Sequence, residues 1–133
     1  MTVSQKRKRL FISHSSSDRI FADEVRRGLE MRGFDSWFLG VDDPGEETRA
    51  DLERGLLEAD VYVVFLSSDS LSSPWVLFEV GTAAGRRKKI VPVLLTDFAL
   101  QHSPAIISRF RAVDAQGQSA AHVAESIGEL LEE

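Results

Sequence analysis

Five strand-length runs rich in apolar or aromatic residues, each followed by a polar turn, occur along the chain. These runs cover residues 10–12, 34–39, 61–66, 90–95 and 110–113. The third run, Val-Tyr-Val-Val-Phe-Leu, has no polar position, which is typical of a parallel strand covered by helices on both faces. Within the fourth run, Pro92 indicates a bulge or an unpaired edge stretch, because proline has no backbone N–H to donate.

Segments with helical periodicity separate these runs. The first carries apolar residues at Val25 and Leu29, and we expect it to run from an N-cap at Asp18 to about residue 32, where Gly33 ends it. Further helices are expected at residues 46–57, at residues 75–85 and in a closing amphipathic segment that carries Val123, Ile127, Leu130 and Leu131.

This alternation predicts an α/β fold of the flavodoxin-like, doubly wound type, with a five-stranded parallel sheet in the order 2-1-3-4-5 and helices on both faces. Ligands of such sheets bind outside the carboxyl ends of the strands, near the switch point between strands one and three. The loops expected at that end are residues 13–18, 40–45 and 67–73, and polar residues concentrate in them. These loops are therefore the candidate site.

Length and composition describe one ordinary globular domain, residues 1–133, in which we expect the basic residues 1–8 to form a flexible tail. The absence of cysteine excludes disulfides, thiolate zinc sites and a cysteine nucleophile. A net charge of −5 gives no general attraction to nucleic acid or anionic membranes, so we expect neither as a partner. No signal segment or membrane-length apolar run is visible, and a cytoplasmic location is the expectation.

A second basic run, Arg86 to Lys89, follows the helix expected at residues 75–85. Cations there complement the dipole of the helix C-terminus, which is the simpler interpretation. A contact with a polyphosphate or nucleic acid is the alternative.

Several common site chemistries lack their motifs. Neither a dinucleotide-binding GxGxxG nor a P-loop GxxxxGK[ST] occurs. The three histidines, His14, His102 and His122, lie too far apart in the sequence to suggest a metal site, and we expect none. His14 lies beside two serines, but the segment is not a nucleophile elbow, so serine hydrolase chemistry is disfavoured.

Residues 73–79, Ser-Pro-Trp-Val-Leu-Phe-Glu, carry the most suggestive pattern. Serine suits an N-cap and proline the first helical position, so Trp75 and Glu79 would share one face, one helical turn apart. A carboxylate beside an aromatic ring at the mouth of a sheet suits an electron-poor ring and its attached sugar. Spacing alone leaves a solvated surface carboxylate equally open, and Trp37 and Trp75 could both be core residues.

Five segments, in order and correctly spaced, resemble those of bacterial TIR domains. They are residues 9–18 (Arg-Leu-Phe-Ile-Ser-His-Ser-Ser-Ser-Asp), residues 33–38 (Gly-Phe-Asp-Ser-Trp-Phe), the loop Asp43-Pro44-Gly45, Leu66-Ser67 with residues 73–79, and Pro92-Val93-Leu94. The resemblance covers nearly the full length of the chain.

The resemblance implies an NAD+ glycohydrolase or cyclase that cleaves the nicotinamide–ribose bond and acts in bacterial immunity or signalling. It implies Glu79 as the catalytic residue. The expected substrate-binding residues are Ser13, His14, Ser15, Trp37, Ser67 and Trp75. Self-association is expected to activate the enzyme, with other TIR domains as further partners, through an interaction loop formed by Asp42, Asp43, Pro44 and Gly45. NAD+ would be a substrate, and no cofactor is expected.

The chemistry of this reaction accommodates a single carboxylate. Nicotinamide in NAD+ is a cationic leaving group, so it departs without a general acid, unlike the leaving group of an ordinary glycosidase. Glu79 would bind the ribose hydroxyls and stabilise an oxocarbenium-like transition state. Attack by water gives ADP-ribose, and attack by an adenine nitrogen gives a cyclic isomer.

Two other classes remain open. One is a non-enzymatic module for TIR–TIR interaction, an adaptor or an inhibitor of host Toll-like signalling. The Phe-Trp box of receptor TIR domains is not recognisable, with Phe110 the nearest candidate, and Asp42 and Asp43 make the interaction loop acidic. These departures weaken a receptor-type adaptor more than an enzyme. The other class is a nucleoside deoxyribosyltransferase-like enzyme, which shares the architecture and a catalytic glutamate.

Overall fold

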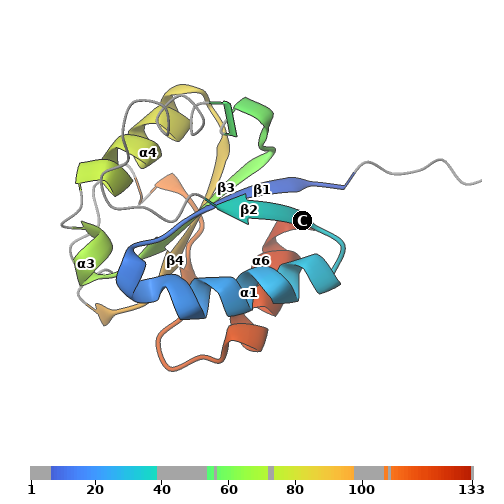
Figure 1. The fold of residues 1–133 in the computed structure, drawn as a ribbon. Helices are drawn as coiled ribbons and strands as arrows, with labels where there is room; N and C mark the ends of the chain where they lie inside the picture. Colours follow the sequence, from blue (N-terminus) through green and yellow to red (C-terminus); the bar gives the residue numbers. More distant parts are fainter. Residues whose placement is uncertain are drawn as a thin grey trace, which may run out of the picture.

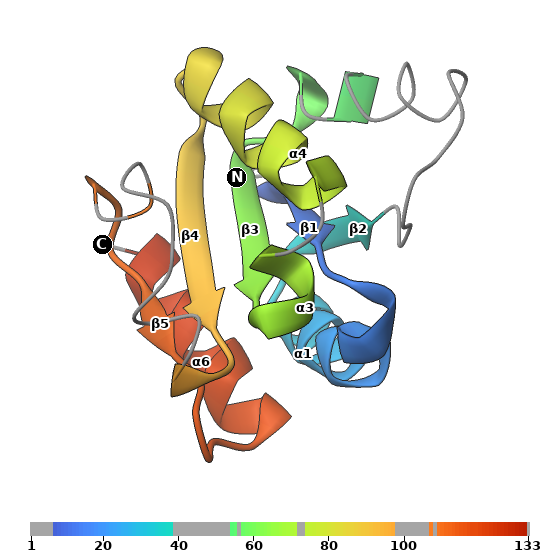
Figure 2. The same ribbon diagram turned by 90° about the vertical axis from the view of Figure 1, so that its left-hand side faces the viewer.

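The computed structural model describes residues 7–38, 54, 55, 57–71, 74–97, 107 and 109–132; within these, the side chains of Phe38 and of residues 74–77 are not described. Within this part of the chain, five parallel strands form one sheet in the order β2-β1-β3-β4-β5, as predicted. Figure 2 shows the strands side by side in this order. Their bounds are β1 Arg9–Ser13, β2 Asp35–Phe38, β3 Val61–Leu66, β4 Lys89–Leu94 and β5 Val113–Asp114.

Helices cover both faces of the sheet (Figure 1). Helices α1 (Arg19–Met31) and α6 (Ala120–Leu131) pack side by side on one face, and α4 (Pro74–Gly85) lies on the other. Two shorter elements lie at the carboxyl ends of the central strands: a 3-10 turn, η1 (Ser16–Asp18), and a one-turn helix, α3 (Ser68–Leu71). No helix in the described ranges is both long and apolar enough to cross a membrane.

Alternation along the strands divides the core into two layers. In β1, Leu10 and Ile12 belong to the cluster under α1 and α6, whereas Phe11 belongs to the cluster under α4. All six residues of β3 are buried, because β3 is central and both its faces are covered. The apolar run at residues 61–66 is therefore the strand that it predicts.

Most predicted elements are confirmed, and their ends have identifiable causes. Gly33 ends the first helix with a φ of +96°, a conformation that suits glycine. Pro74 occupies the first position of α4, where no N–H is needed. Pro92 pairs with Val64 on β3, while β5 pairs with β4 only through the two residues beyond Pro92. Among the described residues, Pro92 therefore has no ladder partner on the β5 side of β4, which agrees with the second of the two predicted alternatives, an unpaired stretch.

Three predictions need correction. The serine-rich segment predicted as a loop is helical at Ser68–Leu71. The last strand is Val113–Asp114 and does not begin at Phe110, which packs partly buried against the α4-side core. The prediction that the basic run complements the end of α4 is wrong for Lys88, whose Nζ donates to the carbonyls of Leu57 and Ala59, at the end of another helical stretch.

Candidate functional site

The candidate site lies where β1 and β3 end side by side at the switch point of the sheet. Ser13 is the last residue of β1, and its Cα partner on β3 is Val64. After β1 the chain continues into η1 and α1 on one face of the sheet, whereas after β3 it continues into α3 and α4 on the other face. The two segments therefore diverge at this point. The predicted residues Ser13, His14, Ser15 and Ser67 all lie at this end and are all buried.

Glu79 lies in the second turn of α4 and points into the sheet, not into solvent. Its exposed fraction is 1%, and the hydroxyl of Tyr62 donates a hydrogen bond of 3.3 Å to its Oε2. Tyr62 belongs to β3 and is itself fully buried. Of the two interpretations that spacing left open, the solvated surface carboxylate does not hold in this structure, and Glu79 is a core residue.

Ser13 completes this buried polar group. Its hydroxyl lies close enough to the Glu79 carboxyl and to Tyr62 to favour the charged form of each. Its Oγ nonetheless makes no hydrogen bond of good geometry within the described part of the chain, and it is shielded from solvent. A buried hydroxyl with spare hydrogen-bonding capacity is costly unless a partner arrives.

Burial sets the protonation state of these groups. Removal from water raises the pKa of Glu79 from 4.5 to about 8, and the nearby hydroxyl groups of Ser13 and Tyr62 oppose this rise only in part. Burial, and then the nearby Glu79, also raise the pKa of Tyr62 well above its usual value. Glu79 is therefore mainly protonated at neutral pH in this conformation.

An aromatic stack supports the Tyr62 ring from the β1 and β2 side. Phe11 lies 6.0 Å from Tyr62 and 5.8 Å from Trp37, centroid to centroid, and meets Trp37 edge-on. A Cβ at Gly55 would lie 2.7 Å from Phe11 and 3.1 Å from Trp37 Nε1, so only glycine fits at this close approach. Trp37 is thus packed at this point, and its role in binding a ligand ring stays a prediction.

A second polar cluster joins the loops after β1 and β3. The carboxylate of Asp18 accepts hydrogen bonds from Ser15 Oγ at 2.8 Å and from Ser67 Oγ at 2.7 Å. Ser17 donates to Asp69 at 2.7 Å, which ties η1 to α3 a second time. These hydrogen bonds hold the two loops together beside the buried glutamate.

The same cluster explains the corrected helix at Ser68–Leu71. The hydroxyl of Ser70 accepts a 2.6 Å hydrogen bond from the Ser67 N–H, while Ser67 Oγ accepts from the Ser70 N–H at 3.3 Å. This reciprocal pair resembles a capping box, with serine at both positions. Two buried serine hydroxyls thus stabilise a turn that composition alone predicts as a loop.

The sequence places four of the predicted binding residues at the sheet end, where the structure has them, but it does not reveal the contacts of Tyr62 and Asp18. In the sequence, Tyr62 is only one member of an apolar strand, although its hydroxyl provides the hydrogen bond to Glu79. Asp18 was expected as an N-cap; it does precede α1, but its side chain makes no cap hydrogen bond and bridges the loops instead. His14 is buried, with Nδ1 2.7 Å from the Ser15 carbonyl oxygen.

Other predicted residues lie outside the described residues. These are the interaction loop, Asp42, Asp43, Pro44 and Gly45, the N-cap Ser73, the indole of Trp75 and most of the basic tail. Their roles stay predictions. Within the described ranges, no group of three or more His, Cys, Asp or Glu side chains is placed to hold a metal ion.

Solved structures with the same fold span several protein classes. The CMP N-glycosidase BcmB of Clostridium botulinum matches with a TM-score of 0.63 at 15% identity, over 92% of this chain and 99% of that chain. A flavodoxin-like domain from Synechococcus sp. matches with a TM-score of 0.61 at 16% identity, over 92% and 98%. The TIR domains of the activated Roq1 resistosome match with a TM-score of 0.56 at 20% identity, over 92% and 71%. At these identities the likeness shows a shared fold.

Family membership comes from the sequence itself. No curated protein sequence matches the chain. The family model of the TIR domain, however, matches residues 10–131, which include every described strand and helix except the first residue of β1. The chain therefore belongs to the TIR domain family.

Proposed function

We propose that this TIR domain cleaves NAD+ at the nicotinamide–ribose bond, with Glu79 as the catalytic carboxylate. The observation that carries the proposal is the buried Glu79–Tyr62–Ser13 group at the carboxyl end of β1. A carboxyl group whose pKa is raised to about 8 by burial, next to a ligand-binding switch point, is typical of functional sites.

The proposal requires Glu79 to be ionised when the bond breaks. The described conformation holds it protonated and covered, which corresponds to a resting state. A cationic nicotinamide ring beside Glu79 favours the carboxylate, because a nearby positive charge lowers a carboxyl pKa. NAD+ binding and proton release from Glu79 are therefore coupled.

The residues around Glu79 then have definable tasks. Tyr62 donates to the carboxylate and keeps it oriented. The carboxylate stabilises the positive charge that develops on the ribose as nicotinamide leaves as a neutral molecule. Ser13 Oγ, with its spare hydrogen-bonding capacity, would bind a ribose hydroxyl. Water attack on the anomeric carbon gives ADP-ribose and a proton; attack by adenine nitrogen gives the cyclic isomer.

Two findings from the comparisons support the proposal. BcmB is a CMP N-glycosidase with the same fold, so this fold is compatible with cleavage of an N-glycosidic bond. The Roq1 TIR domains belong to a resistosome, an assembled state, in keeping with activation by self-association. We propose the same for this chain, with Asp42, Asp43, Pro44 and Gly45 as the interaction loop and with NAD+ as the substrate.

A non-enzymatic interaction module is the second candidate, and one observation favours it. Glu79 is 1% exposed, so a substrate reaches it only after α4 or its surroundings move. If no such movement occurs, the glutamate has a purely structural role and assembly is the only function.

A substrate panel separates these candidates. The domain, clustered on a scaffold, is incubated with NAD+, CMP and a deoxynucleoside, and the released bases are separated by chromatography. We expect nicotinamide release that Glu79→Ala abolishes and that Glu129→Ala, an exposed control on α6, leaves unchanged. If a base were released from CMP or from the deoxynucleoside but not from NAD+, Glu79 would be the catalytic residue for a different N-glycosidic substrate. If no base were released from any of the three compounds, the non-enzymatic interaction module would be the supported function.

A further inference from the structure

The carboxylate of Asp18 lies between the loop after β1 and the loop after β3. It accepts a hydrogen bond of 2.8 Å from Ser15 Oγ and one of 2.7 Å from Ser67 Oγ. Ser15 comes just after β1 and Ser67 just after β3, the two neighbouring strands that end at the switch point. A carboxylate of the chain itself therefore lies at the end of the sheet where folds of this type bind their ligands.

The two hydroxyl donors are buried, whereas their acceptor is not. Ser15 is 3% exposed and Ser67 is 5% exposed. The N–H of Ser70 donates to Ser67 Oγ at 3.3 Å, which helps to hold that hydroxyl in place. Asp18 is partly exposed, and its side chain makes no cap hydrogen bond to α1. A change of side-chain rotamer therefore takes the Asp18 carboxylate into water without the loss of a helix cap.

A phosphate oxygen can replace the carboxylate oxygen at this serine pair, Ser15 and Ser67. Both kinds of oxygen are anionic acceptors, and a hydrogen bond from a hydroxyl group to either is charge-assisted. Phosphate therefore satisfies the same two donors.

Ser13 provides a second contact close to the serine pair. Its buried Oγ makes no hydrogen bond of good geometry within the described part of the chain. Ser13 and Ser15 are two residues apart, at most about 7 Å along the chain. A ribose carries its 5′-phosphate within a similar distance. A ligand with a ribose at Ser13 thus brings its phosphates to the serine pair.

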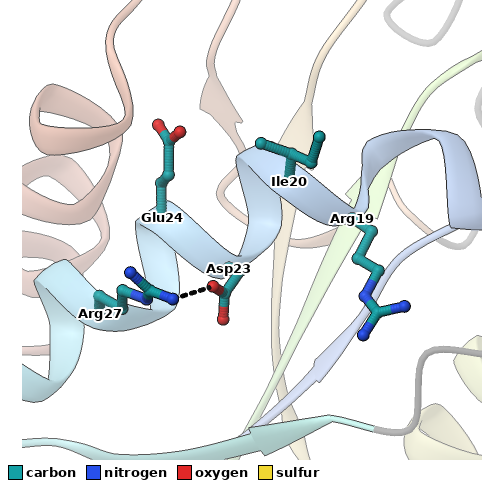
Figure 3. A pocket seen from close by; sticks show the side chains of 5 residues that line it. All are labelled: Arg19, Ile20, Asp23, Glu24 and Arg27. Atoms are coloured by element: carbon teal, nitrogen blue, oxygen red, sulfur yellow. Dashed lines mark ion pairs between the residues drawn. The ribbon is translucent and has the colours of Figure 1, made fainter.

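Arg19 supplies a positive charge next to the bridging carboxylate. It is the following residue, it is exposed, and it forms no ion pair within the described ranges. Asp23, one helical turn away, is already paired with Arg27 at 3.0 Å (Figure 3). In the same view, Arg19 points away from the side of α1 that carries Ile20 and Glu24. These five residues line a hollow of about 320 Å³ on α1, which is separate from the serine pair.

Asp69 is a second acid close to the serine pair. Its carboxylate accepts a hydrogen bond of 2.7 Å from Ser17 Oγ and so also ties η1 to α3. Of the three charged groups Asp18, Arg19 and Asp69, one cation and one anion remain when Asp18 turns into solvent. The departure of Asp18 therefore removes the negative charge that would repel a phosphate from the serine pair.

We propose that Asp18 is an internal competitor for the phosphate groups of the substrate. In the resting state it occupies the hydroxyls of Ser15 and Ser67, and the pyrophosphate of the dinucleotide displaces it. The inference rests on the proposed function for the identity of the ligand, but it concerns binding and not bond cleavage. The competition lowers the apparent affinity by the fraction of molecules in which Asp18 has left the serine pair.

Calorimetric titration with ADP-ribose tests this competition, on the chain clustered as in the substrate panel. ADP-ribose carries the ribose and the pyrophosphate but has no nicotinamide bond to cleave. Asp18→Ala should bind it about ten-fold more tightly than wild type, because a site open in roughly one molecule in ten becomes fully open. Asp18→Asn keeps a neutral acceptor of the same shape, so its affinity should lie between the two. Inorganic pyrophosphate should give the same order, whereas adenosine, which has no phosphate, should not distinguish the three proteins.

Two further variants separate displacement of Asp18 from simple loosening of the loops. Asp69→Ala breaks the hydrogen bond from Ser17 but leaves Asp18 on the serine pair, so its affinity for ADP-ribose should stay within about two-fold of wild type. Asp18→Ala combined with Ser67→Ala should lose most of the gain, because one of the two hydroxyl donors is then absent. Circular dichroism verifies that each variant is folded, and Asp18→Asn carries the comparison if Asp18→Ala does not fold.

Three results would each overturn the proposal. Asp18→Ala and Asp18→Asn that bind ADP-ribose no better than wild type would leave Asp18 as a purely structural tie. An equal gain in Asp69→Ala would mean that loosening alone opens the site. A gain for adenosine as large as that for ADP-ribose would mean that phosphate is not what Asp18 excludes. If affinity rises as expected but no nicotinamide is released from NAD+, the enzymatic proposal fails while this one stands.

Discussion

Replacing Glu79 with glutamine should change the pH dependence of stability in a defined way. The pKa of Glu79 is raised from 4.5 to about 8 in the folded state, so the folded protein holds a proton that the unfolded chain releases. Stability from this group is therefore complete below pH 4.5 and is lost as the pH rises through 8. Glutamine has nearly the same shape and stays neutral throughout.

The magnitude follows from the two pKa values. One pKa unit corresponds to about 1.4 kcal/mol, so wild type should lose about 3 kcal/mol of unfolding free energy between pH 5 and pH 8 because of Glu79 alone. This is a large part of the roughly 5–15 kcal/mol that stabilises a typical domain. Glu79→Gln should show no such loss, so its unfolding free energy relative to wild type should rise steadily from pH 5 to pH 8.

Urea unfolding at pH 5, 6, 7 and 8 measures this difference. Subtracting the two profiles cancels the titration of all other groups. Glu129→Gln serves as the control, because it removes an exposed carboxylate and should give a profile parallel to wild type. Parallel profiles for wild type and Glu79→Gln would refute the reasoning, since they would mean that Glu79 is ionised and solvated in the folded protein.

Three further predictions concern the elements around the site. Tyr62→Phe removes a hydrogen bond that lowers the pKa of Glu79, so the pH-dependent loss of stability should extend above pH 8 and nicotinamide release should need a higher pH; an unchanged pH profile would contradict this. Asp18→Ala removes the shared acceptor of two serine hydroxyls and should cost about 2 kcal/mol by urea unfolding, whereas a loss near zero would show that the loops are held otherwise. Gly33→Ala should destabilise the protein by about 1 kcal/mol or more, because φ at this position is +96°. Gly81 lies inside α4 with open space around it, so Gly81→Ala should stabilise the protein by up to about 1 kcal/mol. Thermal unfolding of both variants measures this, and the opposite order of stability would contradict the backbone argument.

The topology could be predicted from the sequence because its signals are local. The apolar run at Val61–Leu66 matches β3 residue for residue, and Gly33 and Pro74 mark helix ends by chemistry that acts within a few residues. The helix at Ser68–Leu71 could not be predicted in this way. Serine and aspartate have low helix propensity, and the turn depends on two buried hydroxyls that reciprocally bond the backbone.

The sequence predicts where the site lies, but it does not predict that Glu79 is buried and protonated there. The loops after β1 and β3 follow from strand order, so Ser13 and Ser67 could be assigned to the same sheet end. The hydrogen bond between Tyr62 and Glu79 depends on how α4 packs against β3, seventeen residues away in sequence. No spacing rule reports such a tertiary contact, and so the buried, protonated glutamate appears only in the structure.

The most direct test of the central claim is the steady-state rate of nicotinamide release by clustered wild type and Glu79→Gln. Glutamine keeps the size and hydrogen-bonding shape of the side chain but cannot carry the charge that stabilises the transition state. We predict that kcat falls by about a thousand-fold or more, as for loss of one key electrostatic group, and that KM for NAD+ rises, because NAD+ binding is coupled to a carboxylate that the variant lacks. A Glu79→Gln variant that releases nicotinamide at a rate within a few-fold of wild type would contradict the account.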